Sequence, residues 1–283
     1  MAKKNASLKK ILVPTDFSDK AERALEIACE LARVTRCSIT ILHVIELPYS
    51  TELRKAKLKQ ELEKSAKPAL KEAVKKAKSM LARLKIDIKE KMVVGNPVHD
   101  IVQEASAGGY DLICMGNTIT SGLRRLVFDN TTSGVIDLAN CPVLATTSKH
   151  PSIQFGSMLF GTDYREGDLS ILGKVCALAS DLKSTLSIVH ISKKKGFEER
   201  LRAAGFETLT RQKVAYKDIR FEQFYNSDID NGIETAIKDI NAGLIILSRE
   251  HRGILDTLFG SDVIDDLVYK VEVPVLVFPI QST

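Results

Sequence analysis

The sequence predicts an α/β protein made of two tandem domains, each with a five-stranded parallel sheet covered by helices on both faces. Three observations predict this fold. The 283-residue chain contains one internal repeat, its strand candidates are continuous apolar runs rather than alternating ones, and helical patterns separate those runs. A chain of 283 residues also suits two domains of about 140 residues each.

The repeat needs no gap over the first part of each copy. ILVPTDFSDKAERALEIACELARVTRCSITILHVIE, from Ile11, matches MLFGTDYREGDLSILGKVCALASDLKSTLSIVHISK, from Met158, at an offset of 147 residues. Further on, DLICMG from Asp111 matches GLIILS from Gly243 at an offset of 132. The second copy therefore lacks fifteen residues between its second and third strands. We predict domain 1 over residues 1–149 and domain 2 over residues 150–283.

The elements of the first copy follow in chain order. An apolar, β-branched strand over 10–13 ends at Pro14, and Ser18 is a good N-cap for a helix whose apolar face runs from Ala21 to Ala32. The remaining elements are a strand over 39–45, a strand over 89–94, a helix over 98–107, a strand over 111–115, a helix over 132–138 and a strand over 142–146.

The lysine-rich segment from Thr51 to Lys91 carries much of the net charge of +5. It holds twelve lysines and two arginines, but apolar residues recur in it at helical spacing and glutamates interleave with the lysines. This pattern predicts the solvated face of an amphipathic helix rather than a nucleic-acid surface. Pro68 is expected to start a second helix or to kink the first.

Composition narrows the class of protein. Apolar residues make up 44% and charged residues 27%, as in ordinary soluble domains. We find no apolar run near the roughly 20 residues of a membrane helix, and no apolar core follows the basic start, so we expect a cytoplasmic protein without membrane contact. The five cysteines are scattered and form no CxxC pair, which argues against a disulfide framework and a structural zinc site.

Ligands of such sheets bind beyond the carboxyl ends of the strands, where the strand order reverses. If the first and fourth strands flank that point, the loop Pro14-Thr15-Asp16 meets the loop that begins at Gly116. Asp16 and its repeat equivalent Asp163 would then belong to the binding site. The alternative is that each only caps the helix that follows it. His43 and His190 are also equivalent, and we interpret both as packing residues.

The motifs ILVPTDFS, SITILHV, GNPVHDIV, YDLICMG and CPVLA occur in this order in the first copy. MLFGTDY, LSIVHI, GLIILS, FGSDV and VPVLVF repeat the series in the second. The chain thereby resembles the universal stress proteins in their tandem form. The resemblance implies Rossmann-like sheets of order 3-2-1-4-5 and a pseudo-two-fold between the halves, often through the last strands at Val143-Leu144 and Val275-Leu276. It also implies a homodimer of tandem chains.

ATP-binding members of that family carry Gly, two residues, Gly, nine residues and Gly-Ser or Gly-Thr after the fourth strand, and they use the Asp that ends strand one. Such glycines let the backbone approach phosphates, and a helix start favours an anion. Domain 1 keeps Gly116, but Ile119 and Asp129-Asn130 replace the other motif positions. A carboxylate about 4 Å from a phosphate costs about 4 kcal/mol at an effective dielectric of 20.

Domain 2 keeps Gly260-Ser261 and carries Gly253 in the loop, although Ser248 replaces the first glycine. We therefore predict that ATP or a related adenine nucleotide, with Mg²⁺, binds more readily in domain 2. The nucleotide-binding residues predicted there are Gly161, Thr162, Asp163, Ile191, Leu247, Ser248, His251, Gly253, Gly260 and Ser261. The residues of the degenerate site in domain 1 are Pro14, Thr15, Asp16, Val44, Met115, Gly116, Thr118 and Asn130.

The sequence contains no catalytic signature such as GxSxG, HExxH or GxxxxGK[ST], and no clustered metal ligands. The first hypothesis is a non-catalytic, nucleotide-responsive stress protein with weak ATPase activity at most. A second is a nucleotide-free scaffold that acts through its surfaces on protein partners that the sequence does not name. A third is a module for a small ligand or a lipid in the vestigial pockets.

Overall fold

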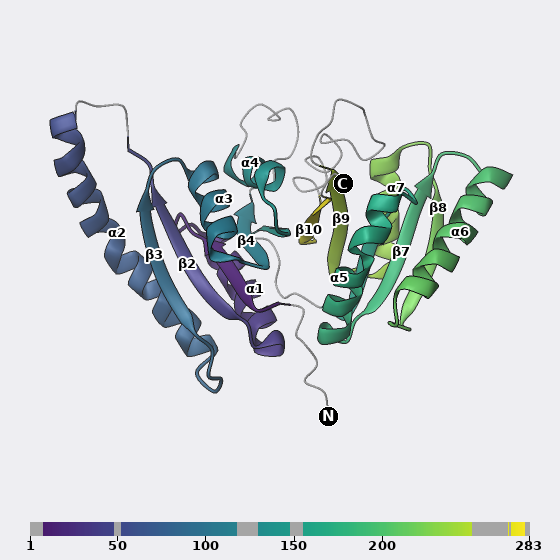
Figure 1. The fold of residues 1–283 in the computed structure, drawn as a ribbon, viewed down its shortest axis with the longest axis horizontal. Coiled ribbons are helices and arrows are strands. Elements are labelled where there is room, and N and C mark those ends of the chain that lie inside the picture. The colour runs from purple at the N-terminus through teal and green to yellow at the C-terminus, as the bar shows by residue number, and fades with distance from the viewer. Residues whose placement is uncertain are drawn as a thin grey trace. The chain divides into compact units, whose positions relative to one another are not determined.

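The computed structural model describes residues 8–47, 52–117, 130–147, 155–250, 271 and 273–280. These residues fall into two units that follow the repeat, one within 8–147 and the other within 155–280 (Figure 1). The predicted boundary between residues 149 and 150 lies outside the described residues and stays a prediction. Each unit is described by itself below.

Domain 1 is a five-stranded parallel sheet in the order β3-β2-β1-β4-β5, as predicted. Its elements are β1 (Lys10–Pro14), α1 (Asp19–Thr35), β2 (Ser38–Ile45), α2 (Glu52–Met80), β3 (Ile88–Val94), α3 (Pro97–Gly108), β4 (Leu112–Asn117), α4 (Asn130–Leu138) and β5 (Val143–Thr147). The predicted elements are confirmed, with ends that differ by a few residues.

Domain 2 repeats this topology in the order β8-β7-β6-β9-β10, again with parallel neighbours. Its described elements are β6 (Ser157–Gly161), α5 (Glu166–Leu182), β7 (Thr185–Ser192), α6 (Phe197–Lys213), β8 (Ile219–Tyr225), α7 (Ile229–Ile240), β9 (Leu244–Glu250) and β10 (Val275–Ile280). The segment missing from the second copy corresponds to the shorter α6, which has 17 residues where α2 has 29.

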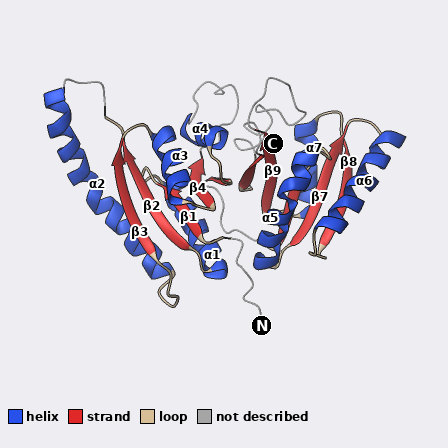
Figure 2. Ribbon diagram, viewed as in Figure 1, coloured by secondary structure: helices blue, strands red, loops and turns tan. Residues whose placement is uncertain are grey.

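Helices cover both faces of each sheet, which explains the continuous apolar strands (Figure 2). Ile11, Leu12 and Val13 are all fully buried although their side chains alternate between the two faces. Because parallel crossovers are right-handed, α1 and α2 lie on one face of domain 1, and α3 and α4 lie on the other. The strand ends that define the predicted site therefore lie between two helical layers.

The start of α1 is fixed by the predicted cap. The Ser18 hydroxyl accepts a hydrogen bond from the Ala21 backbone N–H at 3.4 Å. The helix ends at Arg36, a left-handed residue whose N–H donates to the Ala32 carbonyl. Ser18 therefore holds the N-terminus of α1 beside the loop that carries Asp16.

A second helix does not start at Pro68, because α2 continues through it, and the alternative of a kink stays a prediction. Pro68 lies on the exposed face and removes one backbone hydrogen bond there, while Leu70, Val74 and Ala77 are buried on the opposite face. Burial of that face holds the helix together on both sides of the proline. Neither α2 nor any other described helix is both long and apolar enough to cross a membrane.

All five cysteines are free thiols, and four of them are buried. Burial raises the pKa of Cys29 to about 12 and the pKa values of Cys141 and Cys176 to about 11. The thiols are therefore protonated packing groups at neutral pH.

Candidate functional site at the ends of the first and fourth strands

The loop that follows the first strand has the same shape in both domains. Phe17 and Tyr164 both adopt left-handed backbone angles, with φ of 63° and 59°. Their backbone N–H groups donate to the hydroxyls of Thr15 and Thr162 at 3.0 and 2.9 Å. This turn places Asp16 and Asp163 at equivalent points beyond the carboxyl end of the strand.

In domain 1 the Asp16 carboxylate faces solvent. Its Oδ1 accepts hydrogen bonds from the Ser18 N–H at 3.0 Å and the Ser18 hydroxyl at 2.5 Å, and Lys20 Nζ lies 3.9 Å from Oδ2. Partial burial raises the pKa of Asp16, but the Ser18 hydrogen bonds and the Lys20 charge outweigh it, so the net pKa is lowered. Asp16 therefore holds Ser18, the N-cap of α1, in place and remains an ionised hydrogen-bond acceptor on the solvent side.

A cavity of about 140 Å³ opens beside Asp16 in domain 1. It gathers six of the predicted residues: Pro14, Thr15, Asp16, Val44, Met115 and Gly116. Of the other two, Thr118 and the side chain of Asn130 lie outside the described residues. The prediction did not include the other lining residues, which are Lys20, Ala21, Leu42, His43, Pro97, Ile101, Thr131 and Thr132.

Gly116 is required by the close approach of α1 to the end of β4. A Cβ added there would lie 2.4 Å from the carbonyl carbon of Lys20 and 2.7 Å from the backbone nitrogen of Ala21. On the other face, the Thr132 hydroxyl donates to the Gly116 carbonyl at 3.1 Å and fixes the start of α4. The first glycine of the motif thus lets two helix N-termini converge on the cavity.

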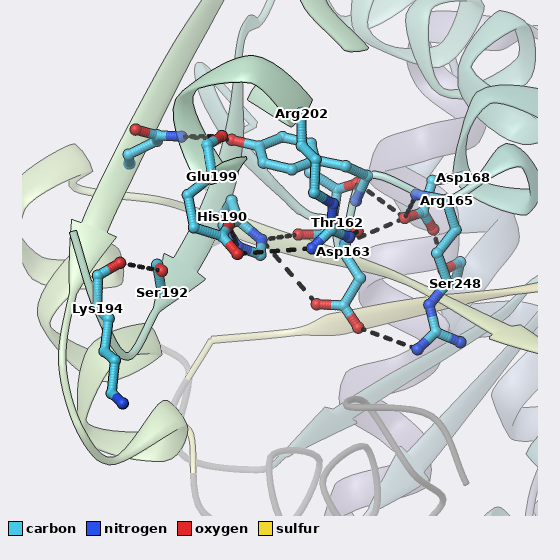
Figure 3. A network of polar contacts seen from close by, with 12 residues as sticks. Thr162, Asp163, Arg165, Asp168, His190, Ser192, Lys194, Glu199, Arg202 and Ser248 are labelled. Atoms are coloured by element: carbon cyan, nitrogen blue, oxygen red, sulfur yellow. Dashed lines mark hydrogen bonds and ion pairs between the residues drawn. The ribbon is translucent and has the colours of Figure 1, made fainter. Parts of the chain in front are cut away.

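The equivalent carboxylate in domain 2 is enclosed. Asp163 is 5% exposed and lies between Arg165 Nη2, at 3.7 Å, and His190 Nδ1, at 4.0 Å (Figure 3). Burial raises the pKa of Asp163 to about 6, against the opposing effect of Arg165 and His190. The backbone carbonyl of Asp163 also accepts a hydrogen bond from Arg202 Nη2 at 2.7 Å.

A second buried carboxylate, Asp168, ties the strand ends of domain 2 together (Figure 3). Its Oδ2 accepts hydrogen bonds from the Thr162 hydroxyl at 2.7 Å, the Asp163 N–H at 3.1 Å and the Arg165 N–H at 3.4 Å. Its Oδ1 accepts a hydrogen bond from the Ser248 hydroxyl. Asp168 thus joins the start of α5 to the ends of β6 and β9.

The repeat shows what this polar pair replaces. At the offset of 147, Asp168 is equivalent to Ala21, and at the offset of 132, Ser248 is equivalent to Gly116. Two small residues that line the cavity of domain 1 thus become a hydrogen-bonded pair in domain 2. Asp168 was not among the predicted site residues, although the replacement of Ala21 by an aspartate in the gapless repeat indicated a changed environment.

The two equivalent histidines pack as predicted, and one of them also borders the cavity. His43 Nδ1 lies 2.8 Å from the Thr15 carbonyl, and its ring stacks on Phe17 with a centroid distance of 4.4 Å. His190 makes the same contact to the Thr162 carbonyl at 2.8 Å, and its Nε2 lies 3.2 Å from Glu199. The carbonyl contacts place a proton on Nδ1 of both rings, because carbonyls only accept hydrogen bonds.

The remaining predicted residues of domain 2 divide into two groups. Gly161 ends β6, Ile191 is the last residue but one of β7, and Leu247 lies in the middle of β9 with its side chain against Gly161. The segment that holds His251, Gly253, Gly260 and Ser261 lies outside the described residues. Among the residues that are described, no cluster of three or more His, Cys, Asp or Glu side chains could hold a metal ion.

Comparisons with known proteins agree with this geometry. The model of the universal stress protein family matches residues 7–147. Universal stress protein MJ0531 of Methanocaldococcus jannaschii is 33% identical over 144 residues, which are 48% of this chain and 80% of that protein. The chain belongs to the universal stress protein family. MJ0577, a second universal stress protein of that organism, is 30% identical over 156 residues, which are 50% of this chain and 96% of that protein.

Solved universal stress proteins resemble the chain as well. A universal stress protein from Archaeoglobus fulgidus matches 95% of this chain and 98% of its own, with a TM-score of 0.76 and 20% identity. This likeness shows that the tandem fold extends over both domains. Another universal stress protein, solved in complex with cAMP, is 28% identical and matches 52% of this chain and 100% of its own, with a TM-score of 0.42.

Proposed function

We propose that this universal stress protein binds an adenine nucleotide as a signal, without catalysis, and that the base or ribose enters the cavity of domain 1. The observation that carries the proposal is the cavity itself, which gathers six of the eight residues predicted for the nucleotide site of domain 1. The ionised Asp16 can accept a hydrogen bond from a ribose hydroxyl or from the adenine amine. Val44 and Met115 supply apolar walls for the base.

The size of the cavity limits what it holds. A volume of about 140 Å³ is below the roughly 300–1,000 Å³ of sites that bury a whole drug-sized ligand. The cavity therefore suits one end of a nucleotide, and the phosphates would extend toward the segment that follows β4. Lys20, which lines the cavity, supplies a positive charge for them.

The sequence favoured domain 2 because of Gly253 and Gly260-Ser261. That preference stays a prediction, because these residues lie outside the described part of the chain. The described contacts of domain 2 favour a nucleotide site in domain 1 instead. Ser248 and Asp168, the equivalents of two residues that line the cavity of domain 1, are hydrogen-bonded to each other. A ligand entering there would separate a buried carboxylate from its partner, at a cost of about 1–3 kcal/mol or more.

The test exchanges the residue that distinguishes the two copies. Ala21→Asp places the carboxylate of domain 2 into domain 1, at the third helical position, where an acidic residue suits the helix start. Asp168→Ala is the matched variant in domain 2. Both are titrated calorimetrically with Mg-ATP, ADP and cAMP beside the wild type, and the supernatant of denatured wild-type protein is assayed for co-purified nucleotide.

We expect saturable binding that Ala21→Asp abolishes and Asp168→Ala leaves intact. Binding that survives Ala21→Asp but is lost in Ser261→Asp would assign the site to domain 2. If the folded wild type shows no saturable binding at millimolar nucleotide, the nucleotide proposal is wrong and the function as a nucleotide-free scaffold is favoured. Circular dichroism of each variant establishes that a lost signal is not a lost fold.

We further propose that occupancy changes self-association, since the family resemblance implies a homodimer of tandem chains. Sedimentation velocity with and without Mg-ATP measures this directly. An unchanged sedimentation coefficient at saturating nucleotide would separate binding from assembly and direct the search to other partners.

A further inference from the structure

Domain 1 contains a second and larger cavity, of about 530 Å³, between α1, α2 and the sheet. This volume lies within the range of roughly 300–1,000 Å³ typical of small-molecule sites. Its lining residues are Val13, Thr15, Phe17, Ala21, Glu22, Leu25, Ile41, Ala69, Glu72, Ala73, Lys75, Lys76, Ser79 and Met80. Nothing in the nucleotide proposal uses this space.

The cavity exists because α2 presents small side chains where a packed core would have large ones. Ala69 and Ala73 face it from consecutive turns of α2. In domain 2, α6 takes the place of α2 and carries Phe206, which is 3% exposed and stacks on Tyr164 with a centroid distance of 5.2 Å. The space left in domain 1 opens to solvent at its charged rim, so a small molecule can enter it.

The rim of the cavity carries lysines and glutamates that pair with each other, so their charges largely cancel. Lys76 Nζ binds the Glu22 carboxylate and lies 2.7 Å from Glu26 Oε1, so it joins α2 to α1. Lys75 pairs with Glu72 at 3.5 Å, and both side chains are more than 70% exposed. A charged ligand head would lie beside both signs of charge and would compete with existing pairs, so the rim favours a ligand without net charge.

We propose that this cavity binds an uncharged amphipathic molecule with a single apolar chain, such as a medium-chain alcohol or ester. The chain lies against the part-exposed Phe17, Ala73 and Met80, and the polar end lies at the rim. The Thr15 and Ser79 hydroxyls line the cavity and can donate to or accept from a neutral oxygen. The apolar walls supply the affinity, and the neutral rim supplies the selection against ions.

The experiment titrates the full-length protein with decan-1-ol and, separately, with decanoate, by ligand-observed NMR and calorimetry. We expect saturable, one-to-one binding of decanol, and binding of decanoate weaker by about tenfold or more, because a carboxylate loses hydration at a neutral rim. Ala73→Phe, which copies the aromatic filling of domain 2, should abolish decanol binding. Lys71→Phe adds the same ring on the exposed face of α2 and should leave it unchanged.

Several outcomes would overturn the proposal. They are no saturable binding of decanol to the wild type, tighter binding of decanoate than of decanol, and undiminished decanol binding by Ala73→Phe. If Ala73→Phe does not give the wild-type circular dichroism spectrum, Ala69→Leu serves as the filling variant with the same expected loss. Glu72→Gln gives a second measurement, because it removes the carboxylate partner of Lys75 and should bring the affinity of decanoate closer to that of decanol.

Discussion

Asp16 and Asp163 occupy the same position in the repeat, one residue after the threonine that follows the first strand of each domain. Asp16 is hydrogen-bonded to Ser18 and its side chain is 58% exposed, whereas Asp163 is enclosed by Arg165, His190 and the Asp168 network. The pKa of the first is lowered and that of the second is raised to about 6. One residue type thus has opposite electrostatic roles in two copies of one fold.

The raised pKa of Asp163 predicts a stability difference that depends on pH. Between about pH 4 and pH 6 the folded state keeps a proton that the unfolded state releases, so the wild type loses stability as pH rises through this window. Asp163→Asn has no such loss. We expect its unfolding free energy, relative to wild type, to grow by up to about 3 kcal/mol from pH 4 to pH 7. Denaturant unfolding at each pH, monitored by hydrogen exchange of the backbone amides in β6 and α5, measures this difference in unfolding free energy.

Asp16→Asn is the control for this prediction. Because the pKa of Asp16 is lowered, its contribution to stability is present above its unfolded-state pKa and is lost as pH falls. The variant should therefore be less stable than wild type at pH 7, and the difference should shrink toward low pH. Equal pH profiles for the two variants would contradict both assignments.

The close packing at Gly116 predicts a local cost for any side chain. Gly116→Ala should destabilise domain 1 by about 1–3 kcal/mol, because its Cβ would meet the backbone of Lys20 and Ala21. Gly173→Ala is the matched control, since it adds a Cβ on the exposed side of α5 with no atom within 4 Å. That change should stabilise domain 2 by about 0.5–1 kcal/mol. Thermal unfolding by calorimetry distinguishes the two, and a stabilising Gly116→Ala would contradict the packing argument.

At the scale of elements, α2 and α6 fill the same place in the repeat in different ways. α2 is longer, carries Pro68 and leaves a cavity above the sheet, whereas α6 packs Phe206 against Tyr164. The length difference lies where the two copies lose their sequence match. The elements that surround the strand ends are conserved in position between the copies, and the crossover between the second and third strands is the part that has diverged.

The unbroken course of α2 predicts that its proline is a removable defect. Pro68→Ala restores one backbone N–H on an exposed face of the helix and removes the clash of the ring with the preceding turn. We expect domain 1 to gain up to about 3 kcal/mol of stability. Lys67→Ala, one residue earlier and also exposed, should change stability by less than about 0.5 kcal/mol. Chemical denaturation of both variants measures the difference, and a destabilising Pro68→Ala would mean that α2 needs the proline.

Much of the fold could be predicted because its signals are local or repeated. Continuous apolar runs such as Ile11 to Val13 indicated a sheet buried on both faces, and Ser18 marked the start of α1. A helix that continues through Pro68 was one of two alternatives, and the sequence could not decide between them because burial of the opposite face is a tertiary effect.

The site was predicted in part for a similar reason. Parallel strands bring Asp16 and Gly116 to one edge whatever the side chains are, so the cavity followed from strand order. In domain 2 the equivalents of two residues that line this cavity, Asp168 and Ser248, are hydrogen-bonded to each other from separate elements. Predicting that contact requires knowledge of which side chains face each other, and a comparison of the two copies does not supply it.

At the scale of the whole molecule, the excess of basic residues does not amount to a nucleic-acid surface. The chain has 41 basic and 36 acidic residues, and lysines of α2 pair with glutamates, as Lys59 does with Glu63 at 3.8 Å and Lys76 with Glu26 at 2.7 Å. We expect at most weak, non-specific binding of duplex DNA that disappears between about 50 and 200 mM salt. Fluorescence anisotropy with labelled DNA measures this, and salt-resistant binding would contradict it.

Thr15 and Ala21 line both cavities of domain 1, so they form a wall shared by the place proposed for a nucleotide and the place proposed for a neutral chain. Any shift of that wall on filling one side changes the free energy of filling the other. Thermodynamic linkage makes such an effect equal in both directions, so the factor by which the nucleotide alters the affinity of the chain is the factor by which the chain alters that of the nucleotide. Under these two proposals, the occupancy of either cavity of domain 1 would depend on the concentrations of both ligands.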